Sequence, residues 1–142
     1  MKKTNKKGFT LVELLAVIVI LGVLLMIAVP AIQNVIRSSR KKSFESAAQL
    51  VIENIEAVAS AERVTGDILP CYVLIDKNFE LERGSLGTNP SGYVTVDAKG
   101  KGTIKYTDGT YRAEGTLNNI TTSKSGNSIG APTDLQKCTW WG

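Results

Sequence analysis

An almost uncharged segment near the N-terminus constrains this chain more than any other feature. From Phe9 to Ile36 it contains one ionisable side chain, that of Glu13. As a helix rising about 1.5 Å per residue, the part from Phe9 to Ile32 would be about 36 Å long, enough to cross a hydrocarbon core of about 30 Å. We therefore expect this segment to lie in a membrane.

A short basic leader, residues 1–8, precedes the apolar segment and ends in Gly8. A secretory signal places its cleavage site after its apolar region, whereas this leader ends before it. Cleavage after Gly8 would therefore leave the apolar helix on the mature protein.

The octapeptide Lys6-Lys7-Gly8-Phe9-Thr10-Leu11-Val12-Glu13 resembles the processing site of type IV prepilins and pseudopilins. The resemblance covers the leader and the helix through about residue 65. It implies that a dedicated peptidase cuts after Gly8 and methylates the new amino terminus at Phe9. It also implies that Glu13 directs subunit assembly. Nothing in the C-terminal half can be assigned a role in this way.

Charge and histidine content argue against several classes of function. Without residues 1–8 the chain has 13 basic and 13 acidic side chains, so bulk charge gives no reason to expect nucleic-acid binding. The chain contains no histidine, which removes the commonest general base and the Ser-His and Cys-His nucleophile arrangements. We expect no enzyme, no cofactor and no metal site.

The two cysteines, Cys71 and Cys138, fit a single disulfide if the C-terminal half is exported to an oxidising compartment. The alternative is a pair of buried thiols. A closed zinc site would need two further ligands.

Positive charge flanks the apolar segment on both sides, so charge alone leaves its orientation undecided. The cations after it form the basic segment, residues 37–42: Arg37, Arg40, Lys41 and Lys42. The prepilin resemblance places residue 37 and everything after it outside. The basic segment would then either contact lipid headgroups as a solvated helix face or pair with Glu45, Glu53 or Glu56 of a neighbouring subunit.

Gly22 and Pro30 interrupt the apolar segment. Pro30 removes one backbone donor and clashes with the carbonyl of Met26, so a bend near Met26 is expected. The resemblance implies that residues 23–29 can lose helicity on entering a filament. The alternative for the free subunit is a kinked but continuous helix.

An amphipathic pattern follows the apolar segment. Its apolar residues recur at spacings of three and four: Phe44, Ala47, Ala48, Val51, Ile55 and Val58. We predict one helix from Phe9 to about Val64, with Gly66 as C-cap and Pro70 beyond. At about 84 Å, it is too long for a head of 77 residues to cover, so its N-terminal half must be buried by lipid or by copies of itself.

The pattern after the helix predicts strands over residues 71–75, 93–96, 103–107 and 110–114. Asp108-Gly109 predicts a two-residue type I′ hairpin, which would place Tyr106 opposite Tyr111 and Ile104 opposite Ala113. The resulting antiparallel meander should pack its apolar face on the helix stripe.

The segment Leu117–Leu135 has few apolar residues and is predicted to be a long surface loop. Cys138, with Trp140 and Trp141 packed beside the bridge, would anchor it. Binding of a target by the tryptophans is the alternative. Asn119 begins a glycosylation sequon, a pattern that is common by chance.

These features predict an α+β, type IV pilin-like fold. Its parts are a cleaved leader (1–8), a helix (9–65, with 9–36 in the membrane or filament core) and a β head (66–142). The leading function is a structural pilin subunit that moves from the cytoplasmic membrane to a cell-surface filament for adhesion or motility. Its partners would be copies of itself, the prepilin peptidase and methyltransferase, the assembly machinery and the membrane. The alternatives are a pseudopilin for secretion or DNA uptake, and a single-span membrane protein with a binding head.

Overall fold

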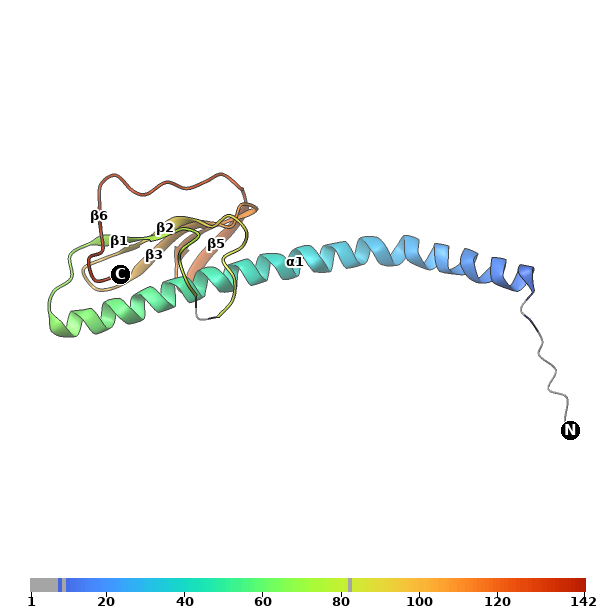
Figure 1. Cartoon of the computed structure of the whole chain (residues 1–142), viewed down its shortest axis with the longest axis horizontal. Helices are drawn as coiled ribbons and strands as arrows, with labels where there is room; N and C mark the ends of the chain where they lie inside the picture. Colours follow the sequence, from blue (N-terminus) through green and yellow to red (C-terminus); the bar gives the residue numbers. More distant parts are fainter. Residues whose placement is uncertain (1–7, 9, 82) are drawn as a thin grey trace, which may run out of the picture. The chain divides into compact units, whose positions relative to one another are not determined.

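A computed structural model of the chain describes Gly8, residues 10–81 and residues 83–142. The architecture is α+β and pilin-like, with one long N-terminal helix and a sheet of six strands (Figure 1). The elements are α1 (Leu11–Thr65), β1 (Cys71–Ile75), β2 (Ser91–Val96), β3 (Gly102–Thr107), β4 (Tyr111–Thr116), β5 (Asn119–Lys124) and β6 (Gln136–Lys137). The chain divides into two compact units, Met1–Ser39 and Arg40–Gly142.

Helix α1 runs without interruption through Gly22 and Pro30. Residues 23–29 are helical in the isolated chain, as the continuous-helix alternative expects. The bend near Met26 and a loss of helicity in a filament stay predictions. The predicted helix start at Phe9 lies outside the described residues, and the described helix begins at Leu11.

The C-terminus of α1 lies where the sequence predicts, but its predicted cap is wrong. The helix ends at Thr65, and Gly66 is absent from the glycines with positive φ, so it does not form a left-handed C-cap. Instead the Thr65 hydroxyl donates a hydrogen bond to the Glu62 carbonyl oxygen at 2.7 Å. A side chain thus satisfies one of the free carbonyls of the last turn.

The core of the head lies between α1 and one face of the sheet. The helix contributes buried side chains at spacings of three and four: Phe44, Ala47, Ala48, Val51, Ile52, Ile55 and Ala59. Val58, which the predicted stripe includes, is half-buried, and its place is taken by Ile52 and Ala59. The strands alternate buried and more exposed residues, as expected for a sheet with one face on a helix.

The strand order is β5-β4-β3-β2-β1-β6. Every neighbouring pair is antiparallel except β1 and β6, which are parallel. The chain from β1 to β5 therefore forms a meander, as predicted, and the short strand β6 is added beside β1.

The predicted register of the β3–β4 hairpin is wrong by two residues. Tyr106 pairs with Ala113 and Ile104 with Gly115. Asp108 does not have positive φ, so the turn is not type I′, and its carboxylate accepts the backbone N–H groups of residues 110 and 111. A shift of two residues preserves the alternation, so Ile104, Tyr106 and Ala113 are all buried as expected.

The predicted loop Leu117–Leu135 is also wrong, because it contains β5. This strand pairs with β4 along its whole length, from Thr116 opposite Asn119 to Tyr111 opposite Lys124. It is an edge strand with mostly exposed side chains, so it lacks the apolar alternation by which strands are predicted. The remaining loop, residues 125–135, crosses from the β5 edge to the β6 edge of the sheet (Figure 1).

A disulfide between Cys71 and Cys138 joins the first strand to the C-terminal segment. Beside it, Cys138 N–H donates a hydrogen bond to the Tyr72 carbonyl oxygen at 2.9 Å. Trp141 stacks on Phe79 with ring centroids 5.6 Å apart, and Trp140 meets Trp141 edge to face. Both tryptophans are half-buried against the core of the head.

Candidate processing and assembly site

The N-terminal end of α1 is closed by a reciprocal pair of side chains. Thr10 donates its backbone N–H and its hydroxyl to Glu13 Oε2, at 2.9 and 3.0 Å. In return, Glu13 donates its backbone N–H to Thr10 Oγ1 at 3.2 Å. Thr10 and Glu13 therefore form a capping box, in which Thr10 is the N-cap residue and Glu13 occupies the third position of the helix.

The sequence-based predictions do not include this capping box, although the motif has a signal in the sequence. A threonine followed three residues later by a glutamate, directly before an apolar run, is the pattern of this motif. The box gives Glu13 a local structural role, close to the positive end of the helix dipole. Both hydrogen bonds that the Glu13 carboxylate accepts from Thr10 go to its Oε2 atom. In the described part of the chain, Glu13 Oε1 accepts no hydrogen bond.

Gly8 is exposed, and a Cβ atom added to it would meet no other atom within 4 Å. The fold therefore places no steric demand for glycine at this position. Phe9, the predicted new terminus, lies outside the described residues.

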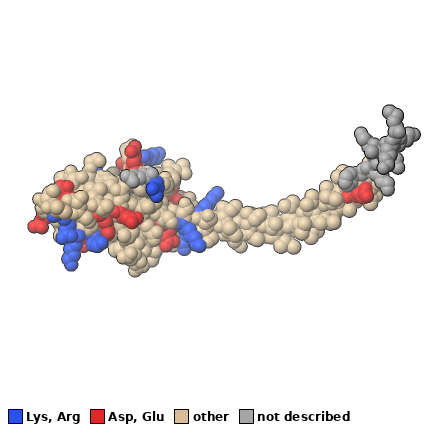
Figure 2. Space-filling view, turned by 90° about the horizontal axis from the view of Figure 1, so that it is seen from below, with Lys and Arg blue, Asp and Glu red and all other residues tan. Residues whose placement is uncertain are grey.

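The helix that follows the capping box is long and apolar enough to cross a membrane, and within the described residues it is the one helix that is. From Leu11 to Ile36 its side chains are exposed in the isolated chain, including Leu11 at 82% and Met26 at 78%. Between Glu13 and Arg37 it carries no charge, and Figure 2 shows this part of the surface as uniformly uncharged. An exposed apolar surface of this extent marks a site that contacts a membrane or another protein chain.

The predicted site residues fall into separate groups. Gly8, Glu13, Gly22 and Pro30 all belong to the unit that ends at Ser39. The disulfide belongs to the other unit, where it closes the C-terminal segment.

One predicted partner of the basic segment is already occupied within the head. Glu56 accepts hydrogen bonds from the Gly102 backbone N–H at 2.9 Å and from Lys101 Nζ at 3.1 Å. Its side chain is only 12% exposed. Glu56 is therefore a poor candidate for pairing with a neighbouring subunit, which leaves Glu45 and Glu53.

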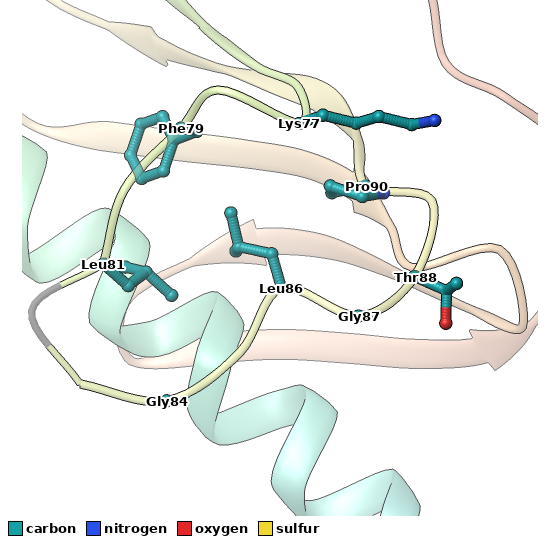
Figure 3. A pocket seen from close by; sticks show the side chains of 8 residues that line it. All are labelled: Lys77, Phe79, Leu81, Gly84, Leu86, Gly87, Thr88 and Pro90. Atoms are coloured by element: carbon teal, nitrogen blue, oxygen red, sulfur yellow. The ribbon is translucent and has the colours of Figure 1, made fainter.

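An open cavity of about 330 Å³ is lined by residues of the connection between β1 and β2, residues 76–90 (Figure 3). The side chains of Phe79, Leu81 and Leu86 point into this loop, whereas that of Lys77 extends away from it. Ligand sites usually combine an apolar lining with a few converging polar groups. The polar side chains among the described lining residues are those of Thr88 and of Lys77, which points away, so they do not form a converging set. In the described residues, no three Cys, Asp or Glu side chains are placed to hold a metal ion.

Residues 3–29 match a family model described as the prokaryotic N-terminal methylation motif. The match includes Gly8, Phe9 and Glu13, as well as Thr10 of the capping box, and it is the signature of type IV prepilin leaders. It ends before the amphipathic half of α1 and the head. No solved structure matches the chain.

Proposed function

Because the chain carries the leader signature of type IV prepilins, we propose that its mature form is the structural subunit of a type IV pilus. The observation that carries this proposal is the methylation motif over residues 3–29, which overlaps an exposed apolar helix. This motif supports the pilin and pseudopilin family and a structural rather than catalytic role. The pilus, with adhesion or motility as its use, is our more specific proposal.

In this proposal the subunit waits in the cytoplasmic membrane, where lipid covers the apolar part of α1. A prepilin peptidase removes residues 1–8 and methylates the amine of Phe9. The exposed position of Gly8 supports access by such an enzyme, since no folded element of the described chain surrounds it.

Assembly would then replace lipid by other copies of the same helix. About 26 exposed residues of helix, from Leu11 to Ile36, would be roughly 39 Å long and could pack against neighbouring copies along that length. The heads would lie outside, in an extracellular filament.

Glu13 would guide this step by attracting the methylated amine of a neighbouring Phe9. A carboxylate in hydrocarbon costs up to about 3 kcal/mol and is retained only if something compensates it. The capping box compensates part of this cost through Oε2, and Oε1 is left for the incoming amine. The attraction is strong where water is excluded, as between packed apolar helices.

The intact mass of the chain from cells, in both membrane and filament fractions, tests the proposal. We expect a mass that lacks residues 1–8 and carries one added methyl group. Gly8→Val should block this processing without disturbing the folded chain, because the fold leaves room for a side chain at residue 8. An intact Met1 in assembled filaments would overturn the proposal, and an unprocessed chain found only in the membrane would favour a single-span protein.

A further inference from the structure

Positive charge in the mature chain is concentrated in the basic segment. Residues 37–42 contain four Lys or Arg and no acid, whereas residues 43–142 contain 9 Lys or Arg and 12 Asp or Glu. The basic segment therefore has a net charge of +4, whereas residues 43–142 have a net charge of −3. A general need for solubility would not require the cations to gather in six residues.

The cations of this segment have no partner within the described chain. All four side chains are exposed, and none takes part in a hydrogen bond or an ion pair between described residues. Lys101 and Arg112 of the head differ in this respect, because they are paired with Glu56 and Glu114. The basic segment thus presents free cationic groups to an external anion.

The place of the segment in the chain indicates which anion it meets. It begins directly after Ile36, the last residue of the apolar stretch, and helix α1 continues through it. From Arg37 to Lys42 the helix rises about 7.5 Å, which is comparable to the roughly 5–8 Å thickness of one headgroup layer of a bilayer. The depth of these cations would therefore be set by the apolar helix before them.

We propose that the basic segment binds the phosphate groups of anionic phospholipids while the subunit resides in the membrane. This inference rests on the membrane insertion that the proposed function includes. Lys and Arg can lay their methylene groups along the apolar boundary and extend their charged ends to phosphates. Arg40 can also form paired hydrogen bonds with phosphate oxygens. Pairing with acids of a second copy requires an axial register that only a filament would supply.

The test uses the chain without residues 1–8, so that the leader lysines cannot attract anionic lipid. This chain is reconstituted in phosphatidylcholine vesicles that contain a minor fraction of phosphatidylglycerol. Spin-labelled analogues of each lipid report how strongly the protein surface selects one headgroup over the other. We expect a preference for phosphatidylglycerol of about fivefold or more at low salt, the size expected for even one Lys or Arg at an anionic surface. The preference should decrease as salt is added.

Two triple variants test whether the lipid preference depends on the position of the cations in the chain or only on how many there are. Arg40→Gln, Lys41→Gln and Lys42→Gln together should reduce the preference to the part that Arg37 alone supplies. The matched control is Lys77→Gln, Lys99→Gln and Lys137→Gln, three exposed lysines of the head, which should leave it unchanged.

Resistance to alkaline extraction shows separately whether the chain is inserted. A chain that does not insert would contradict the proposed function and this inference together. An inserted wild-type chain without lipid preference would overturn the inference alone. A basic-segment variant that keeps the lipid preference but loses filaments would also overturn it, and would assign the segment to acids of a second copy.

Discussion

The ring of Phe44 in α1 stacks on the ring of Tyr106 in β3, with centroids 5.0 Å apart and planes inclined by 18°. The Tyr106 hydroxyl donates a hydrogen bond to the Leu86 carbonyl oxygen in the β1–β2 connection. Tyr106 is fully buried. One side chain therefore links the helix, the sheet and the β1–β2 connection, all within the unit Arg40–Gly142.

Residues 37–142 should fold as a soluble fragment, because the whole core from Phe44 to Cys138 lies within them. We expect a single cooperative thermal transition by circular dichroism. A fragment of residues 66–142, which lacks the buried helix side chains, is the control and should show none. A broad, non-cooperative transition for residues 37–142 would mean that the membrane helix is part of the folding unit.

Tyr106→Phe in this fragment should lower the free energy of unfolding by about 1–3 kcal/mol, because it leaves the buried Leu86 carbonyl without a partner. Urea unfolding measures the change. Tyr111→Phe is the matched control. Its ring also lies against Phe44, but its hydroxyl makes no hydrogen bond to the described residues, so the change should stay within about 0.5 kcal/mol. Equal effects would show that the Tyr106 hydroxyl contributes nothing specific.

Alkaline pH should destabilise the head through the same side chain. Burial, with a smaller contribution from the charge of Asp108, raises the pKa of Tyr106. A tyrosine whose pKa is higher in the folded state contributes stability that is present below the unfolded pKa of about 10 and is lost as pH rises above it. Unfolding free energies between about pH 9 and 11 should fall less steeply for Tyr106→Phe than for wild type. If the unfolding free energy fell equally steeply with pH in both proteins, the raised pKa of Tyr106 would not be the cause.

The disulfide between Cys71 and Cys138 should stabilise the head by at most about 4 kcal/mol, because it closes a long loop in the unfolded chain. The unreduced protein should show no reactive thiol under native conditions. Reduction should lower the unfolding midpoint and loosen the segment that follows β5. Two thiols that react in the native, unreduced protein would count against the bridge.

Sequence periodicity predicts the parts of this fold in which apolar residues recur regularly. The helix stripe and strand β1 are such parts, and the structure places both within a few residues of the predicted bounds. Periodicity does not predict strand β5, because an exposed edge strand has no regularly repeated apolar residues. Its β-branched run Ile120-Thr121-Thr122 was a propensity signal that the low apolar content outweighed.

Turn chemistry was harder to predict than strand position. Asp108-Gly109 favours a two-residue hairpin, but Asp108 instead uses its carboxylate to close a longer loop, and Thr107 donates its hydroxyl to the Tyr111 carbonyl oxygen. Such side-chain bonds compete with standard turns and leave little trace in hydrophobic patterns. At the N-terminus the opposite holds, because Thr10 and Glu13 stand at the spacing of a capping box.

The capping box supplies a sharp control for the proposed role of Glu13 in directing assembly. Thr10→Ala removes the hydroxyl of the capping box but keeps the Glu13 carboxylate. Glu13→Ala removes the carboxylate, and with it both the capping box and any attraction to a neighbour's amine. A role limited to helix capping predicts similar defects in the two variants, each with a cost of about 1 kcal/mol in helix stability. A role in attracting a neighbour's amine predicts a defect only where the carboxylate is lost.

The most direct measurement compares the subunit in sheared surface filaments with the total membrane subunit, for wild type, Thr10→Ala, Glu13→Asp and Glu13→Ala. We predict near-normal filaments for Thr10→Ala and intermediate yield for Glu13→Asp, whose carboxylate is withdrawn by one methylene group. Glu13→Ala should lose most or all filaments while it stays inserted and processed, since alanine lowers the cost of insertion. Normal filament yield from Glu13→Ala would contradict the account, because apolar packing alone would then drive assembly.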